Sequence, residues 1–124
     1  MNAQEPAIGF TPGALFSNGY VAGNTLYIAG QQGPDPEGKL TGVDIAQQTA
    51  NAIAIVKQVA ENAGFGTSDI ISVTIYLTDL SDVPKINEVY TNLMPDPKPA
   101  RAAVQVAGLI GGAKIEISAV AVRH

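Results

Sequence analysis

The clearest element in the sequence is an amphipathic helix, which we expect to run from Asp44 to Ala63. The Asp44 carboxylate can accept hydrogen bonds from free N–H groups of the first turn, and Gln47 follows three residues later, as in a capping box. Gly64 stands after the last helical position, where glycine commonly ends a helix. A helix with one apolar stripe packs that stripe against the core. The stripe consists of Ile45, Thr49, Ala52, Ile53, Val56, Ala60 and Ala63.

A hairpin of two strands is predicted before this helix. Ala14–Val21 and Thr25–Gly30 have the composition of strands, and Gly23 and Asn24 between them tolerate the positive φ angles of a tight turn. The segment Gly33–Gly42 is dense in proline, glycine and aspartate and is predicted to be a loop.

A strand and a shorter helix are predicted after the long helix. Ile70–Leu77 alternates with period two and carries β-branched or aromatic residues on both faces, which is typical of a strand. Ser81 or Asp82 can cap the next helix, and Pro95 helps to end it. The apolar stripe of this helix is Ile86, Val89, Tyr90 and Leu93.

Two final strands complete the predicted sheet. Arg101–Ala107 and Lys114–Val122 flank a turn that holds three glycines, and we expect them to pair as an antiparallel hairpin. The order of elements is then β-β-α-β-α-β-β. We expect an α+β fold in one domain over residues 1–124, with a mixed β-sheet and two helices on one face.

The sheet face away from the helices is predicted to be bare. Val104, Val106, Ile115 and Ile117 are expected to face the helices. An apolar area of this size tends to be covered, so we expect self-association through the bare face. An ordinary antiparallel sheet with one solvated side is the alternative. The bare face is expected to hold Ser72, Thr74, Tyr76, Arg101, Ala103, Gln105, Glu116, Ser118, Val120 and Val122.

The composition narrows the classes of function. The chain has no cysteine, which excludes disulfides, thiolate catalysis and cysteine–zinc sites, and its one histidine is His124 at the C-terminus, a poor place for a catalytic base or metal ligand. The formal net charge is -4 and the basic residues are scattered, so we expect no nucleic-acid binding. No apolar run is long enough to span a bilayer and no secretory signal is visible. We therefore expect no membrane association and a cytoplasmic location.

Arg101 and Glu116 are the most informative pair for chemistry, because we expect them on neighbouring strands and on the bare face. A guanidinium group matches a carboxylate through two parallel hydrogen bonds, and a glutamate can accept a proton or orient a water. The pair is therefore a candidate site for binding and hydrolysing a small carboxylic acid. Spacing alone favours the alternative, a cross-strand ion pair that contributes little when exposed.

Several segments resemble the RidA/YjgF family in the same order and at similar spacing, and the resemblance covers almost the whole chain. It implies a chorismate-mutase-like fold. It also implies a homotrimer in which three sheets line a central barrel and the active sites lie in clefts between subunits. The segments are Val21–Gln31 (VAGNTLYIAGQ), Val73–Leu80 (VTIYLTDL), Ile86–Tyr90 (INEVY), Pro99–Val104 (PARAAV) and Lys114–Ala119 (KIEISA).

The resemblance also implies an activity and a set of site residues. Members of the family hydrolyse reactive 2-enamine and 2-imine acids of the 2-aminoacrylate type to keto acids and ammonia, without a metal or an organic cofactor. By this resemblance Arg101 would bind the carboxylate of the small-molecule substrate, and Glu116 would position or activate the attacking water. Asn87 and Gly30 match further residues of the family's site.

Other functions stay open at this point. One is a deaminase or hydrolase with narrow specificity for a single pathway metabolite. Another is a non-catalytic protein that binds small carboxylates. RNA cleavage or translation inhibition, attributed to some relatives, is disfavoured by the acidic balance of the chain.

Three positions depart from the family pattern toward apolar side chains. Phe16 stands where well-studied members have tyrosine, Ala29 replaces a serine and Ala103 replaces a cysteine. The substrate pocket is therefore expected to be more apolar than usual. Phe16 would either stack on a larger, less polar substrate or pack in the core, and Tyr20 lies nearby in sequence as another source of a hydroxyl.

Overall fold

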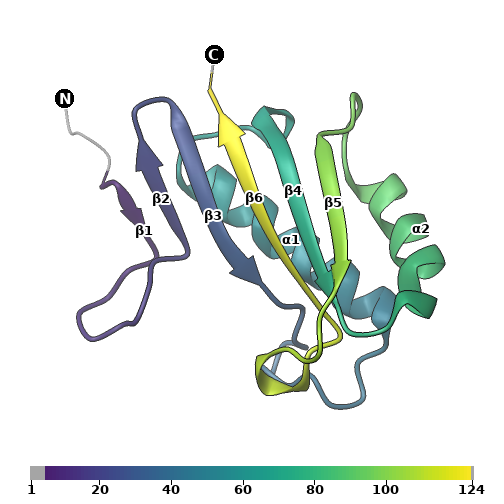
Figure 1. The fold of residues 1–124 in the computed structure, drawn as a ribbon. Helices are drawn as coiled ribbons and strands as arrows, with labels where there is room; N and C mark the ends of the chain where they lie inside the picture. Colours follow the sequence, from purple (N-terminus) through teal and green to yellow (C-terminus); the bar gives the residue numbers. More distant parts are fainter. Residues whose placement is uncertain (1–4, 124) are drawn as a thin grey trace.

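The computed structural model describes residues 5–123. Their strands form one six-stranded sheet in the order β1-β2-β3-β6-β4-β5, and both α-helices lie on the same side of it (Figure 1). The predicted α+β architecture is therefore confirmed. The elements are β1 (Ala7–Ile8), β2 (Gly19–Ala22), β3 (Thr25–Gln31), α1 (Ile45–Asn62), β4 (Ile70–Leu77), α2 (Val83–Leu93), β5 (Ala100–Gln105) and β6 (Ile115–Val122), with short 3-10 helices η1 (Thr67–Asp69), η2 (Leu80–Asp82) and η3 (Ile110–Gly112).

The long helix forms where the sequence predicts it. Asp44 is the N-cap of α1, and its carboxylate accepts a hydrogen bond of 2.8 Å from the backbone N–H of Gln47. Only one of the two hydrogen bonds of a capping box is present, because the Gln47 side chain donates to Asn51 and not to the backbone of Asp44. Gly64 follows with φ +81°, a conformation that glycine adopts without a steric penalty.

The predicted N-terminal strand is shorter than expected. Pairing of β2 with β3 begins only at Gly19, and residues 9–18 form a loop that leaves the sheet. The loop is closed where the backbone N–H of Asn18 donates to the Ile8 carbonyl, next to the two-residue strand β1. β1 was not predicted from the sequence, since a strand of two residues is too short to show alternation.

The last two strands do not form the predicted hairpin. β4 lies between them, pairing in parallel with β5 and antiparallel with β6. The parallel pair is possible because α2 provides the crossover from β4 to β5. The glycine-rich segment 106–114 is then a loop that passes the end of β4, rather than a tight turn.

The two faces of β5 are also the reverse of the prediction. The register places Arg101 opposite Val73 and Ala103 opposite Ile75, and both β4 partners are buried beneath the helices. Val104 instead shares the bare face with Tyr76. β5 is an edge strand on which every residue is exposed, so no burial pattern in its sequence could fix its orientation.

The core lies between the sheet and the helices. α1 packs against β3 and β6, and α2 packs against α1. Two polar side chains inside this layer are satisfied: Gln48 donates to the Val43 carbonyl and accepts from the Lys114 N–H, and Thr49 donates to the Ile45 carbonyl. The largest fully buried apolar side chains are Leu26, Ile53, Ile75, Leu77, Ile86, Ile115 and Ile117.

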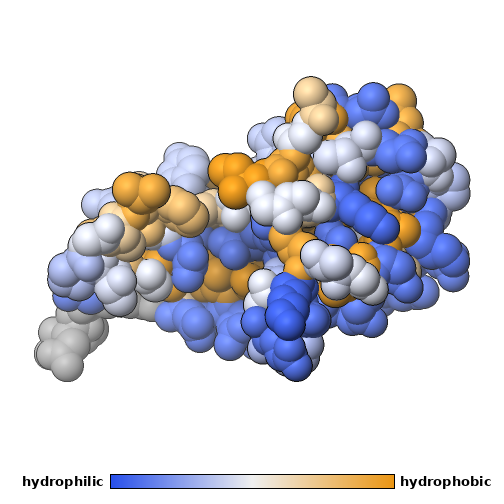
Figure 2. Space-filling model, turned by 90° about the horizontal axis from the view of Figure 1, so that it is seen from below, coloured by the Kyte–Doolittle hydropathy of each residue, from blue (hydrophilic) through white to orange (hydrophobic). Residues whose placement is uncertain are grey.

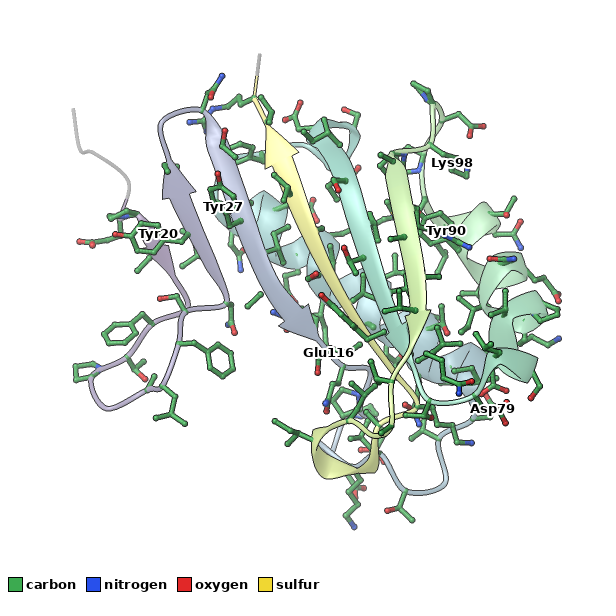
Figure 3. The ribbon with its side chains drawn as sticks, viewed as in Figure 1. Tyr20, Tyr27, Asp79, Tyr90, Lys98 and Glu116 are labelled. Carbon is green, nitrogen blue, oxygen red and sulfur yellow. The ribbon has the colours of Figure 1, made fainter. Side chains whose placement is uncertain are left out.

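The opposite face of the sheet is bare, as predicted, in the part of the chain that the structure describes (Figure 1). Tyr20 on β2 lies beside Tyr27 on β3, and each exposes about half of its surface (Figure 3). Between residues 5 and 123, neither helix is long and apolar enough to cross a bilayer.

Candidate functional site

The structure divides the predicted site residues into two groups. Phe16, Ala29, Gly30 and Glu116 line one cavity of about 600 Å³, which we call the pocket half. Asn87 and Arg101 lie at the other edge of the sheet, where β5 meets α2, with Ala103 two residues further along β5; we call this group the arginine half. In Figure 3 the labelled Glu116 lies at the lower end of β6, and Tyr90 lies on α2 beyond β4 and β5.

An irregularity in the sheet opens the pocket half. Regular pairing of β3 with β6 is interrupted between Ile28 and Gln31, so Ala29 and Gly30 bulge away from the ladder beside Glu116. A Cβ atom on Gly30 would come within 2.3 Å of Glu116 Oε2. Glycine is therefore required at position 30 if the glutamate is to keep this position.

Glu116 is partly buried and is held by a neighbouring amide. Gln32 Nε2 donates to Glu116 Oε1 at 3.1 Å and to the Ile110 carbonyl at 2.8 Å. Gln32 was not predicted as a site residue, since it lies between the predicted strand Thr25–Gly30 and the predicted loop Gly33–Gly42, 78 and 84 residues before its two acceptors.

The remaining wall of the pocket half is mainly apolar. Its large apolar side chains are Phe16, Leu40, Ile55 and Ile110, which come from four separate segments. The other lining residues are Asn18, Gln31, Pro34 and Gly38. Phe16 exposes 64% of its surface, so the alternative that it packs in the core is wrong. From below, the end of the molecule that carries these loops has hydrophobic surface interleaved with hydrophilic surface (Figure 2). A pocket of this composition suits a small molecule with both an apolar part and a few polar atoms.

The arginine half is organised by α2. Arg101 Nη2 donates to Asn87 Oδ1 at 2.8 Å, and the guanidinium carbon lies 4.9 Å from the centre of the Tyr90 ring. Asn87 and Tyr90 are three residues apart and therefore share a helix face. Sequence reasoning placed Tyr90 only in the core stripe. The spacing within INEVY puts Tyr90 on the same helix face as Asn87, and this was the signal in the sequence that Tyr90 belongs to the site.

Tyr90 has an unusual environment for a phenol. Burial raises its pKa above the usual value, and the positive charge of Arg101 lowers it by a smaller amount. The hydroxyl is buried and makes no hydrogen bond to any residue between 5 and 123. Tyr90 therefore contributes its ring face to the arginine half, since a cation is attracted to the electron-rich face of an aromatic ring.

The two halves lie apart within one chain, which corrects the expected Arg101–Glu116 neighbourhood. β4 separates their strands, and Arg101 extends toward α2 whereas Glu116 lies on the bare face with Tyr76. Neighbouring strands are about 4.8 Å apart, so strands two positions apart are separated by about 10 Å. The alternative of a cross-strand ion pair is therefore also wrong.

Residues 5–123 contain no group of three or more histidine, cysteine, aspartate or glutamate side chains placed to hold a metal ion. Tyr20 does not line the pocket half; its side chain lies on the bare face beside Tyr27.

Comparisons with known proteins agree with this architecture. The family model described as Endoribonuclease L-PSP matches residues 8–123. A RutC family protein of Pyrococcus horikoshii is 42% identical over 110 residues, which make up 88% of this chain and 87% of the relative. The 2-iminobutanoate/2-iminopropanoate deaminase of Homo sapiens is 36% identical over 115 residues, or 90% of this chain and 84% of the relative.

Solved structures with the same fold include RidA from an Antarctic Psychrobacter species, with a TM-score of 0.84, 36% identity and coverage of 97% of both chains. Escherichia coli TdcF with bound serine has a TM-score of 0.84 at 32% identity, covering 98% of this chain and 97% of that one. Since the family model spans nearly the whole chain and the relatives share more than 30% identity with it, the chain belongs to the RidA/YjgF family.

Proposed function

We propose that the chain is a hydrolytic deaminase of reactive 2-imino acids and their 2-enamine tautomers, of the 2-aminoacrylate type. The observation that carries this proposal is the state of Arg101. Its guanidinium is oriented by two neutral groups, the Asn87 amide and the Tyr90 ring. Among the described residues it has no acidic partner. An arginine that is already oriented but not neutralised favours a ligand carboxylate.

The separation of the two halves supports a site between two copies of the chain. A small imino acid cannot reach from Arg101 to Glu116 of the same chain, because they lie on different strands and extend to different sides of the sheet. In the proposed homotrimer, three bare faces line a central barrel. The arginine half of one subunit then meets the pocket half of the next, which completes three equivalent sites.

The proposed reaction uses water and needs no cofactor. Arg101 binds the substrate carboxylate and places the imine carbon in the pocket half of the neighbour. Glu116 accepts a proton as the water oxygen bonds to that carbon, and the C=N electron pair moves to nitrogen. Glu116 passes the proton to that nitrogen, which gives the carbinolamine. The carbinolamine hydroxyl then loses its proton through Glu116 to the nitrogen, a C=O bond forms, the C–N bond breaks and ammonia leaves. The imine is already electrophilic, so positioning supplies much of the acceleration.

Two relatives support this substrate class. The human relative is named for the deamination of 2-iminobutanoate and 2-iminopropanoate. The TdcF structure holds serine, which has a carboxylate and a nitrogen on C2, as a 2-imino acid does. Location in the cytoplasm, where pyridoxal-phosphate enzymes generate such imines from serine and threonine, is part of the proposal.

A coupled assay tests the proposal. A threonine dehydratase generates the imine, and release of the keto acid is followed with wild type, Arg101→Ala and Arg123→Ala. Arg123 is a matched control, since it also lies over an aromatic ring, that of Phe65, but outside both halves. Acceleration by wild type and Arg123→Ala, but not by Arg101→Ala, is expected. If wild type does not accelerate release, the deaminase proposal is wrong.

A non-catalytic carboxylate-binding protein is the second candidate. The apolar side chains at Phe16 and Ala29 favour it, because they leave fewer hydroxyl groups to hold a water in the pocket half. For this candidate we expect calorimetric binding of a 2-keto acid that Arg101→Ala abolishes, without any acceleration of imine hydrolysis. A dedicated deaminase for one metabolite would instead act on a single imino acid in a panel of side chains.

A further inference from the structure

Gln32 bridges two parts of the pocket half that are distant in sequence. It follows the end of β3, and its amide nitrogen contacts Ile110 in the loop before β6 and Glu116 within β6. The two acceptors lie 78 and 84 residues further along the chain. The contact therefore joins a loop, the cavity wall and a proposed catalytic side chain at one point.

The chemistry of the two acceptors fixes the orientation of this amide. A backbone carbonyl accepts hydrogen bonds only, and so does an ionised carboxylate. The Gln32 amide group has two N–H bonds, and each has one acceptor at hydrogen-bond distance, 2.8 Å to Ile110 and 3.1 Å to Glu116. Rotation of the amide by 180° would replace both attractive contacts with contacts between oxygens. Gln32 is therefore locked in one orientation.

The two oxygens of the Glu116 carboxylate have different surroundings. Oε1 accepts from Gln32, whereas Oε2 lies against Gly30 and has no hydrogen-bond donor among residues 5–123. Gly30 limits movement of the carboxylate on one side, and Gln32 holds it on the other. This leaves Oε2 as the oxygen that can accept a proton from a water in the cavity.

The Gln32 amide also holds Ile110, which forms part of the cavity wall. Ile110 lines the cavity and exposes 89% of its surface, so its side chain is not fixed by packing. Gly111 and Gly112 follow with φ angles of +75° and +76°, which makes this loop easy to rearrange. The Gln32 contact is the hydrogen bond that ties the Ile110 carbonyl to the strand side of the cavity.

We propose that Gln32 is a positioning residue for Glu116. It holds Oε1 so that Oε2 faces the substrate, and it keeps Ile110 at the position that contacts the substrate side chain. This proposal rests on the proposed deaminase function. Both hydrogen-bond acceptors of Gln32 lie in the pocket half, whereas the carboxylate-binding Arg101 is held by Asn87 in the arginine half. We therefore expect removal of the Gln32 amide to lower the rate of the chemical step and to leave binding of the substrate carboxylate in place.

Kinetics of Gln32→Leu and Gln32→Glu in the coupled assay test this role, since both variants keep the size of the side chain and remove its N–H donors. We expect kcat to fall about tenfold or more, with KM changed by less than about threefold. Gln58→Leu and Gln58→Glu are matched controls at an exposed position of α1 outside the cavity, and we expect wild-type kinetics. Unchanged kcat in both Gln32 variants overturns the proposal while the deaminase function stands. A rise in KM alone also overturns the positioning of Glu116, because Gln32 would then act on substrate binding, either directly or through Ile110.

Crystal structures of wild type and Gln32→Leu provide a readout that does not depend on activity. We expect the Glu116 carboxylate to move away from Gly30 and the Ile110 loop to change position. If wild type lacks deaminase activity, the proposed function fails, and these structures alone decide whether Gln32 positions Glu116. An unchanged Glu116 rotamer in Gln32→Leu overturns the positioning role in either case.

Discussion

The pocket half and the arginine half of the site are built in opposite ways. The arginine half comes from one continuous stretch of chain, in which α2 supplies Asn87 and Tyr90 and the next strand supplies Arg101. The pocket half combines loops from both ends of the sequence around a bulge in the sheet. The arginine half presents a single positive charge held by two neutral groups, and the pocket half presents a mainly apolar cavity. Binding and chemistry are thus assigned to different parts of the fold, which can be perturbed separately.

Paired substitutions in the two halves give the largest expected effect. Arg101→Ala is expected to lower kcat/KM at least about 100-fold, because two charge-assisted hydrogen bonds to a carboxylate contribute about 1.5–3 kcal/mol each. Glu116→Gln is expected to lower kcat while calorimetric binding of a 2-keto acid stays within about threefold of wild type. Wild-type activity of Arg101→Ala on a carboxylate substrate would refute the assignment of the arginine half. A large loss of binding in Glu116→Gln would mean that the two halves are not separate in function.

Mixing the two inactive variants tests whether the halves meet between subunits. After joint refolding of equal amounts of Arg101→Ala and Glu116→Gln, about a quarter of the sites in randomly mixed trimers would combine an intact Arg101 with an intact Glu116. We expect activity near that fraction of wild type, together with a trimeric mass by light scattering. Mixtures that stay inactive although the subunits have exchanged would place the complete site within one chain.

Gly30→Ala is expected to change the shape of the pocket half without changing the stability of the fold. The added Cβ would come within 2.3 Å of Glu116 Oε2, and this is the end of a flexible side chain that can move aside. We expect kcat to fall about tenfold, with the free energy of unfolding changed by less than about 1 kcal/mol. Denaturant unfolding and the coupled assay, run on the same samples, check both parts. Equal activity of the variant and wild type would show that the position of Glu116 does not limit the rate.

The smallest expected effect concerns Tyr90 in the arginine half. Burial raises the pKa of Tyr90 above its usual value of 10.0, so the folded chain holds this proton more tightly than the unfolded chain. The contribution of Tyr90 to stability is fully present below pH about 10, and it is lost as the pH rises through the pKa of Tyr90 in the folded chain. For Tyr90→Phe we expect a free energy of unfolding within about 0.5 kcal/mol of wild type at pH 7. Above pH about 10, we expect this free energy to decline less steeply than in wild type. Parallel alkaline declines of both proteins would mean that another group is responsible. The ring under Arg101 is kept, so activity at pH 7 should be unchanged.

The sequence was most informative where burial leaves a periodic pattern. α1, α2, β4 and β6 each have one covered face, and their residues alternate accordingly. β5 has no covered face, so neither its partner nor its orientation could be predicted from Arg101–Ala107. Gln32 could not be identified because its role depends on contacts with Ile110 and Glu116 that only the closed sheet creates. Tyr90 was correctly assigned to an apolar stripe, and its position near Arg101 follows only once β5 is placed beside α2.

The parallel pairing of β4 with β5 has a further consequence for the order of folding. The Arg101–Asn87 hydrogen bond spans 14 residues, whereas the Gln32–Glu116 hydrogen bond spans 84. Contacts between residues close in sequence require less loop closure and tend to form earlier than distant ones. In a partly folded chain, the anion-binding arginine half would therefore form before the cavity of the pocket half. In a pulse-labelling hydrogen-exchange experiment, amides of α2 should become protected before those of β3 and β6.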